Sequence, residues 1–282
     1  MLKLIECPRD AMQGLHDFIP TELKAAYINQ LLKVGFDTID FGSFVSPKSI
    51  PQLSDTAAVL GKLNLNTTSK LLAIVANKRG AEDACKFEEI NYLGFPFSIS
   101  ETFQKRNTNS TIDQSLVNVE EIQNLCQINK KQLVVYISMA FGNPYNDPWD
   151  LDVAAYWSER LSKELGISIL ALSDTIGVSN RQNIQTLFTG LIANLPQVEF
   201  GAHLHSTPDS VVEKVSAAYE AGCRRFDGAI KGFGGCPMAS DDLTGNMPTE
   251  RMLDYFETNK IGTNLDKDEF KRAMELAVTV FP

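Results

Sequence analysis

The sequence has little of what marks a membrane, secreted or disulfide-bonded protein. Its 282 residues contain no uninterrupted apolar run near the ~20 residues that a membrane-spanning helix requires. Arg9 and Asp10 come too early for the apolar region of a signal peptide, so we expect none. Five cysteines form an odd set without C-x-x-C spacing, which indicates reduced thiols instead of a disulfide framework. Together these absences predict a cytoplasmic protein.

Basic charge is also in short supply. Lys and Arg total 26 against 35 Asp and Glu, which gives a net charge of −9. Because nucleic acids and anionic membranes attract basic surfaces, we expect neither as a partner. A small anionic ligand remains compatible with this charge, since one pocket needs only a few local cations.

Short strand-like runs alternate with helix-like segments along the whole chain. The predicted strands are Leu2–Cys7, Phe36–Phe41, Lys70–Ala76, Phe95–Ser98, Leu133–Ser138, Ile167–Leu172, Val198–His203 and Arg225–Ala229. Such α/β alternation predicts a parallel sheet, and eight units of roughly 35 residues favour a closed (β/α)8 TIM barrel. No glycine-rich dinucleotide motif or linker interrupts the pattern. We therefore expect a single barrel domain over residues 1–282, extended by C-terminal helices near 249–258 and 267–280.

Polar side chains suited to chemistry follow several of the predicted strands. They are Arg9, Asp10, Asp40, Asp174, His203 and His205. Barrel enzymes carry their active sites in the loops at the carboxyl ends of the strands. We therefore expect these side chains to gather on one rim of the barrel.

His203 and His205 are two positions apart on the predicted seventh strand. Residues i and i+2 of a strand share a face about 6.6 Å apart, so both imidazoles can reach one metal ion. Asp10 is the best-placed carboxylate to add negative charge, and mixed N/O ligation suits Mg²⁺, Mn²⁺ or Zn²⁺. The residues leave open a hydrogen-bonded histidine pair, and an Asp10 that caps a helix or pairs with Arg9.

Gly234 and Gly235 precede Cys236 in the most glycine-dense segment of the chain, after the eighth strand. Glycines around one cysteine fit a lid loop that delivers a thiol to a closed site. An ordinary turn with an incidental cysteine is the alternative. Asn246 follows ten residues later, just before a predicted helix, where asparagine is usually a cap.

Six short motifs carry a resemblance to a known family. They are Pro8–Gln13, Ser43–Lys48, Ser100–Asn107, Asp174–Val178, the H-x-H pair and Gly234–Pro237. In this order they resemble the 3-hydroxy-3-methylglutaryl-CoA (HMG-CoA) lyase family, from about Lys3 to Thr263. The second and last motifs distinguish this family from related Claisen-type synthases.

The resemblance implies a TIM barrel with a divalent metal ion, usually Mg²⁺ or Mn²⁺. The implied metal ligands are Asp10, His203, His205 and Asn246. The implied catalytic residues are Arg9, Asp40, Asp174 and Cys236. The residues implied to lie at the substrate are Arg9, Gln13 and Ser43.

The implied reaction is the retro-Claisen cleavage of HMG-CoA to acetoacetate and acetyl-CoA, a step of leucine degradation. The implied partner is a small acyl-CoA, and we also expect a homo-oligomer such as a dimer. This chain departs from the family pattern at Cys7, Ala11, Asp40, Ala171 and Ser206, where the family usually has Gly, Gly, Glu, Ser and Asp. These departures keep two alternatives open: a condensing synthase of the isopropylmalate or citramalate type, and an acyl-CoA binder with impaired catalysis.

Overall fold

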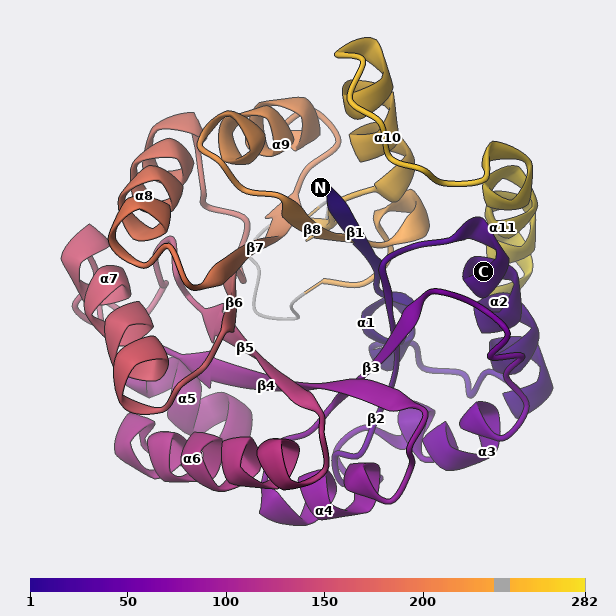
Figure 1. Cartoon of the computed structure of the whole chain (residues 1–282), viewed down its shortest axis with the longest axis horizontal. Coiled ribbons are helices and arrows are strands. Elements are labelled where there is room, and N and C mark those ends of the chain that lie inside the picture. Colours follow the sequence, from indigo (N-terminus) through magenta and orange to yellow (C-terminus); the bar gives the residue numbers. More distant parts are fainter. Residues whose placement is uncertain (236–243, 282) are drawn as a thin grey trace.

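The computed structural model describes residues 1–235 and 244–281. Within these residues, parallel strands form a closed barrel surrounded by helices (Figure 1). The barrel strands are β1 (Lys3–Glu6), β2 (Thr38–Ser43), β3 (Lys70–Ile74), β4 (Ile90–Ser98), β5 (Gln132–Ser138), β6 (Ile169–Asp174), β7 (Glu199–Ser206) and β8 (Arg225–Gly228). Because β1 pairs with both β2 and β8, the ring is complete, and the predicted TIM barrel is confirmed.

The helices lie outside the barrel or over its rim (Figure 1). They are α1 (Pro8–Gln13), α2 (Thr21–Val34), η1 (Pro51–Leu53), α3 (Thr56–Leu60), α4 (Lys78–Cys85), α5 (Glu101–Thr108), α6 (Ile112–Ile128), α7 (Leu151–Glu159), the π-helical η2 (Arg160–Glu164), α8 (Arg181–Asn194), α9 (Val211–Glu220), η3 (Ile230–Gly232), α10 (Thr249–Thr258) and α11 (Lys267–Val280). None of those described is long and apolar enough to cross a membrane.

The sequence pattern does not predict α1 and α5. Both are short and mostly polar, so neither carries the apolar stripe by which a helix is recognised. Arg9 and Asp10 therefore lie in a helix that follows β1 directly, instead of in a loop. Proline is compatible with the first turn of a helix, and Pro8 begins this one.

Side-chain alternation gives the barrel wall two buried faces. On β7, Phe200, Ala202 and Leu204 belong to the large apolar layer between barrel and helices. The intervening Gly201, His203 and His205 point the other way, into the barrel lumen. The lumen between β3, β5 and β6 is filled by a smaller apolar cluster: Leu72, Ile74, Val134, Tyr136, Ile169 and Ala171.

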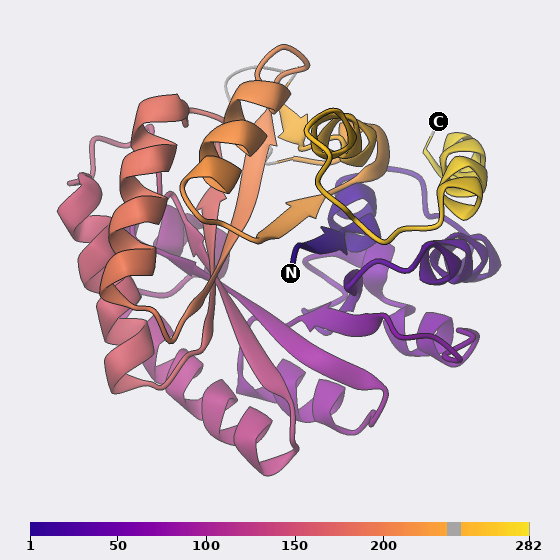
Figure 2. The same cartoon turned by 45° about the horizontal axis from the view of Figure 1, so that its top comes forward.

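The C-terminal helices complete the outer ring, as predicted. Figures 1 and 2 both place α11 beside α2. The Phe281 ring meets Tyr27 of α2 edge-on at 5.7 Å between centroids, and Phe270 of α11 meets Phe36 at 6.3 Å. After β8 the described chain reaches Gly235, so the predicted lid cysteine, Cys236, lies outside the described residues.

Candidate active site

The histidines of β7 and the aspartate of α1 converge at the carboxyl end of the barrel. His203 and His205 both line one cavity, as their i, i+2 spacing predicts, and Asp10 reaches the same place from α1. The ligand atoms of these three side chains all lie within 4.8 Å of one another. Two imidazoles and one carboxylate at this separation form a candidate site for a divalent metal ion.

Each imidazole is oriented through its Nδ1. The Nδ1 of His205 lies 2.9 Å from the Thr175 carbonyl oxygen and therefore carries the proton. The Nε2 of His205 is buried and has no partner among the described residues. The Nδ1 of His203 lies 3.1 Å from Asp227 Oδ2, a carboxylate contact that commonly orients metal-binding histidines. Burial and the neighbouring His203 lower the pKa of His205 to about 4, so this imidazole is neutral and has a lone pair to offer.

Asn246 joins the group through a short strand, β9 (Gly245–Asn246). This strand pairs antiparallel with β7 and places Asn246 opposite His205. The buried Asn246 Nδ2 donates to Asp10 Oδ2 and to Phe233 O, both at 2.8 Å. Its amide oxygen is then the atom left for a metal ion. The alternative of a helix cap is wrong, because Pro248 is the N-cap residue of α10.

Arg9 is held beside this group by two carboxylates. Its Nε and Nη2 donate to Asp40 Oδ2 at 3.0 and 2.6 Å, and its Nη1 donates to Asp10 Oδ1 at 2.9 Å. Gln13 accepts from Arg9 Nη1 at 2.9 Å and donates to Asp10 Oδ1 at 2.7 Å. Of the five guanidinium N–H groups, one on Nη2 has no partner in the part of the chain that the structure describes.

Burial and ion pairing oppose each other at these charges. Burial raises the pKa of Asp40 to about 6, against the effect of Arg9. Burial also acts to raise the pKa of Asp10, but Arg9 and the two histidines outweigh it and lower that pKa. For Arg9, burial acts to lower the pKa, and the charges of Asp40 and Asp10 outweigh it and raise the pKa. Arg9 and Asp10 are therefore charged at neutral pH, and Asp40 is the carboxyl closest to exchanging a proton there.

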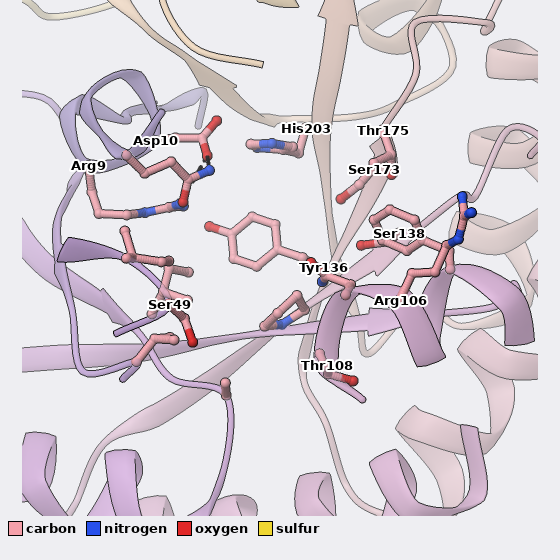
Figure 3. A pocket seen from close by; sticks show the side chains of 18 of the residues that line it. Arg9, Asp10, Ser49, Arg106, Thr108, Tyr136, Ser138, Ser173, Thr175 and His203 are labelled. Carbon is pink, nitrogen blue, oxygen red and sulfur yellow. Dashed lines mark hydrogen bonds and ion pairs between the residues drawn. The ribbon is translucent and has the colours of Figure 1, made fainter. Parts of the chain in front are cut away.

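A cavity of about 590 Å³ opens over this group. Tyr136 of β5 projects into its middle, between the side with Arg9 and Asp10 and the side with Ser138 and Ser173 (Figure 3). The Tyr136 hydroxyl is buried without a partner among the residues described. This hydroxyl is therefore available to a ligand that binds in the cavity.

A second cation, Arg106 near the end of α5, lines the cavity on the side opposite Arg9 (Figure 3). Its guanidinium lies 5.2 Å from the centre of the Tyr145 ring. Lys105, also on α5, forms an ion pair with Glu101 at 3.0 Å. Lys48 is exposed and does not line the described cavity.

Asp174 faces the helices instead of the cavity. Its carboxylate accepts from Val178 N at 2.8 Å and from Ser179 N at 3.0 Å. It also accepts from Lys214 Nζ at 2.7 Å, and the same ammonium donates to His205 O at 2.7 Å. Asp174 and Lys214 of α9 thus tie the loop after β6 to the end of β7, outside the described cavity lining.

Ser43 and Asp40 are also not among the described residues that line the cavity. The Ser43 hydroxyl accepts from Val45 N at 3.1 Å, which shapes the loop after β2. By contrast, Gly234, two residues before Cys236, lies against Asp10 and Asn246. A Cβ on Gly234 would lie 2.7 Å from Asp10 O and 2.8 Å from Asn246 Nδ2, so only glycine fits there.

Sequence reasoning misses Tyr136 and Asp227 as site residues. Tyr136 is hidden in an apolar strand pattern, where an aromatic residue is expected for packing alone. Asp227 leaves a clearer signal, because an aspartate inside a predicted strand needs a buried partner.

A family model described as HMGL-like matches residues 3–277. The chain belongs to the HMGL-like family.

Relatives of this HMGL-like chain are similar over nearly all of its length. Hydroxymethylglutaryl-CoA lyase YngG of Bacillus subtilis is 34% identical over 266 residues, which are 94% of this chain and 88% of that protein. The crystal structure of the Bacillus subtilis HMG-CoA lyase matches with a TM-score of 0.92 and 33% identity, covering 99% of this chain and 93% of that one. An HMG-CoA lyase from Acinetobacter baumannii, in complex with coenzyme A and 3-methylmalate, matches with a TM-score of 0.90 and 31% identity, covering 99% and 91%. The chain is thus an HMG-CoA lyase-like enzyme of the carbon–carbon lyase family.

Proposed function

We propose that the protein cleaves HMG-CoA to acetoacetate and acetyl-CoA in a reaction that depends on a divalent metal ion. The observation that carries the proposal is the convergence of Asp10, His203 and His205 beside Arg9 on one cavity. The Acinetobacter baumannii relative, with coenzyme A and a hydroxy dicarboxylate in its structure, supports an acyl-CoA as the ligand.

The donor set fits a divalent cation. Asp10, His203, His205 and Asn246 offer a carboxylate, two imidazoles and an amide oxygen, and the His205 Nε2 is an orphaned buried atom. Mg²⁺ or Mn²⁺ suits the oxygen ligands, and Zn²⁺ is compatible with the imidazoles. When bound there, the ion supplies Lewis-acid polarisation of a substrate oxygen.

Arg9 acts on the thioester end of the substrate in this proposal. Cleavage of the C2–C3 bond places negative charge on the thioester oxygen of an enolate. The unpaired Nη2–H of Arg9 donates to that oxygen, and the positive charge of the guanidinium stabilises the enolate. Asp40 and Gln13 hold the guanidinium in place beforehand, so little reorganisation is needed during the reaction.

The reaction also moves two protons, one from the C3 hydroxyl and one to C2. We assign acceptance of the first proton to His203, which lines the cavity, while Asp40 lies outside the described lining and holds Arg9 in place. We assign the second to Cys236, carried on the loop whose Gly234 lies against Asp10. Asp174 enters the proposal as a positioning residue through Lys214, and Ser43 by shaping the loop near the substrate.

The test is an assay of acetyl-CoA release from HMG-CoA with added Mg²⁺ or Mn²⁺. We expect turnover that is lost on chelation and restored by either ion. Folded, metal-loaded protein without any release would exclude HMG-CoA as the substrate. Consumption of acetyl-CoA with an α-keto acid would instead identify a condensing synthase.

A third result would identify an acyl-CoA binder with impaired catalysis. Asp40 has a carboxyl stem one methylene shorter than the family's glutamate, and about 1 Å of lost reach can cost up to 10²-fold in rate. Tight HMG-CoA binding without turnover, together with turnover restored by Asp40→Glu, would support that alternative.

A further inference from the structure

A second group of metal-ligating side chains lies below the cavity floor. The ligand atoms of Cys7, His203 and Asp227 all lie within 4.8 Å of one another. Cys7 follows β1 and its amide donates to Gly228 O of β8 at 2.8 Å, which keeps it beside Asp227. Cys7 and Asp227 are both buried and do not line the described cavity. The group shares only His203 with the set formed by Asp10 and His205.

The atoms of this group are poorly satisfied within the described chain. The Oδ1 of Asp227 is buried without a hydrogen-bond partner. The Cys7 Sγ has only a long contact of 4.0 Å to Ile5 O. An unpaired carboxylate oxygen in a buried site is costly, and a bound cation removes that cost.

The surrounding charge also favours a cation. Burial raises the pKa of the Cys7 thiol, and the charges of Asp227, Asp40 and Asp10 raise it further, against the effect of Arg9. Arg225 is the other buried cation near Asp227. Its Nη1 lies 3.3 Å from Glu199 Oε1, its Nε and Nη2 have no partner among the described residues, and against the effect of burial the charge of Asp227 raises its pKa. The sulfur therefore lies in a net negative environment.

We propose that Cys7, His203 and Asp227 form a second metal site for thiophilic divalent ions of the Zn²⁺ class. A thiolate, an imidazole and a carboxylate together select such ions over Mg²⁺ or Mn²⁺. On binding, the S–H bond of Cys7 breaks, the sulfur keeps the electron pair and forms a bond to the metal, and the proton passes to water. No oxidation or reduction is involved.

The shared histidine makes the two sites compete. A neutral imidazole has one lone pair, because its other nitrogen carries the proton. When His203 offers Nε2 to the ion held by Asp10 and His205, its Nδ1–H donates to Asp227. When Nδ1 binds an ion together with Cys7, the proton moves to Nε2, and His203 is lost to the other site. A thiophilic ion below the floor thus weakens metal binding at the cavity through the tautomer of one residue.

Titration of the metal-free full chain with Co²⁺ tests the second site directly. A cobalt–thiolate bond gives a near-ultraviolet charge-transfer band, which an oxygen and nitrogen site does not give. We expect the band in the wild-type protein, its loss in Cys7→Ser and Cys7→Ala, and at least tenfold weaker Co²⁺ binding in Asp227→Asn. Cys85→Ser and Cys236→Ser are matched controls that keep the band. No band in the wild type, a band that persists without Cys7, or one that depends on Cys236 overturns the proposal.

Competition is measured with Mn²⁺, whose free form is detected by electron paramagnetic resonance. One equivalent of Cd²⁺ should release Mn²⁺ from the wild-type protein at least tenfold more effectively than from Cys7→Ser. Equal release from both proteins overturns the competition between the sites. Neither experiment contains HMG-CoA, so failure here is separate from failure of the proposed lyase activity.

Discussion

The barrel wall buries polar groups on both faces, and among the described residues most of the buried polar atoms without a partner lie on the lumen face. On the outer face, the Glu6 carboxyl group accepts from Ile230 N at 2.8 Å and Thr249 Oγ1 at 2.6 Å, and Asp174 accepts several hydrogen bonds, including one from Lys214. On the lumen face, the polar atoms Tyr136 Oη, His205 Nε2, Asp227 Oδ1, Arg225 Nε and Arg225 Nη2 have no partner among the described residues.

This difference separates groups that hold the fold from groups that meet a ligand. An unsatisfied buried polar atom costs about 1–3 kcal/mol, so a cluster of them in one lumen needs a compensating partner. Ser69 and Ser206 are exceptions outside the cluster, and each is a single hydroxyl. We therefore expect changes on the outer face to alter stability, and changes in the lumen to alter binding and turnover.

The largest effect on metal binding is expected for His205→Ala in the lumen. Removal of the orphaned Nε2 takes away a metal ligand, so Mn²⁺ affinity should fall by about 100-fold or more. The free energy of unfolding should change much less than this binding energy. The measurements are Mn²⁺ titration by electron paramagnetic resonance and circular dichroism, with the exposed His16→Ala as control. Unchanged Mn²⁺ affinity in the folded variant would reject His205 as a ligand.

Asp174→Asn, on the outer face, is expected to lower the free energy of unfolding. The amide group would face donors from Ser179 and leave the Lys214 ammonium buried without its counter-charge. Loss of one partner of a buried ion pair costs about 3–5 kcal/mol, which urea unfolding measures. The exposed pair of Glu257 and Lys267 gives the control, and Glu257→Gln should cost less than ~1 kcal/mol. A fully stable Asp174→Asn that has lost only turnover would restore a direct catalytic role for Asp174.

Sequence reasoning predicts the lumen face better where strand periodicity applies. The H-x-H spacing places His203 and His205 on one wall, because a strand repeats every two residues. No such rule relates Asp174 to Lys214, which are 40 residues apart and meet only through packing of α9. The position of Asn246 depends on β9, a two-residue strand too short to leave a pattern.

Glu6→Gln tests how a buried carboxyl group on the outer face makes the free energy of unfolding depend on pH. Burial raises the pKa of Glu6 to about 8, from its usual value of 4.5. The folded protein therefore holds a proton that the unfolded chain releases, and stability falls by up to about 1.4 kcal/mol per pH unit between these values. Glutamine resembles the protonated form, so the variant should be more stable than the wild type by on the order of 3 kcal/mol at pH 8, with a gap below about 1 kcal/mol at pH 5. Thermal unfolding at both pH values measures this, and a gap that does not grow with pH would contradict the buried neutral carboxyl.

Tyr136→Phe is expected to have the smallest effect, and it removes a single unpaired atom of the lumen, the Tyr136 hydroxyl oxygen. Its hydroxyl has no partner in the described chain, so its removal should leave the free energy of unfolding within about 0.5 kcal/mol. If the hydroxyl bonds to the substrate, kcat/KM for HMG-CoA should fall about tenfold, equivalent to ~1.4 kcal/mol. Tyr156→Phe, on an exposed side chain, should change neither quantity. A loss of stability without a loss of kcat/KM would mean that this atom belongs with the groups that hold the fold, and that an empty hydrogen-bond position in the lumen does not by itself mark a ligand contact.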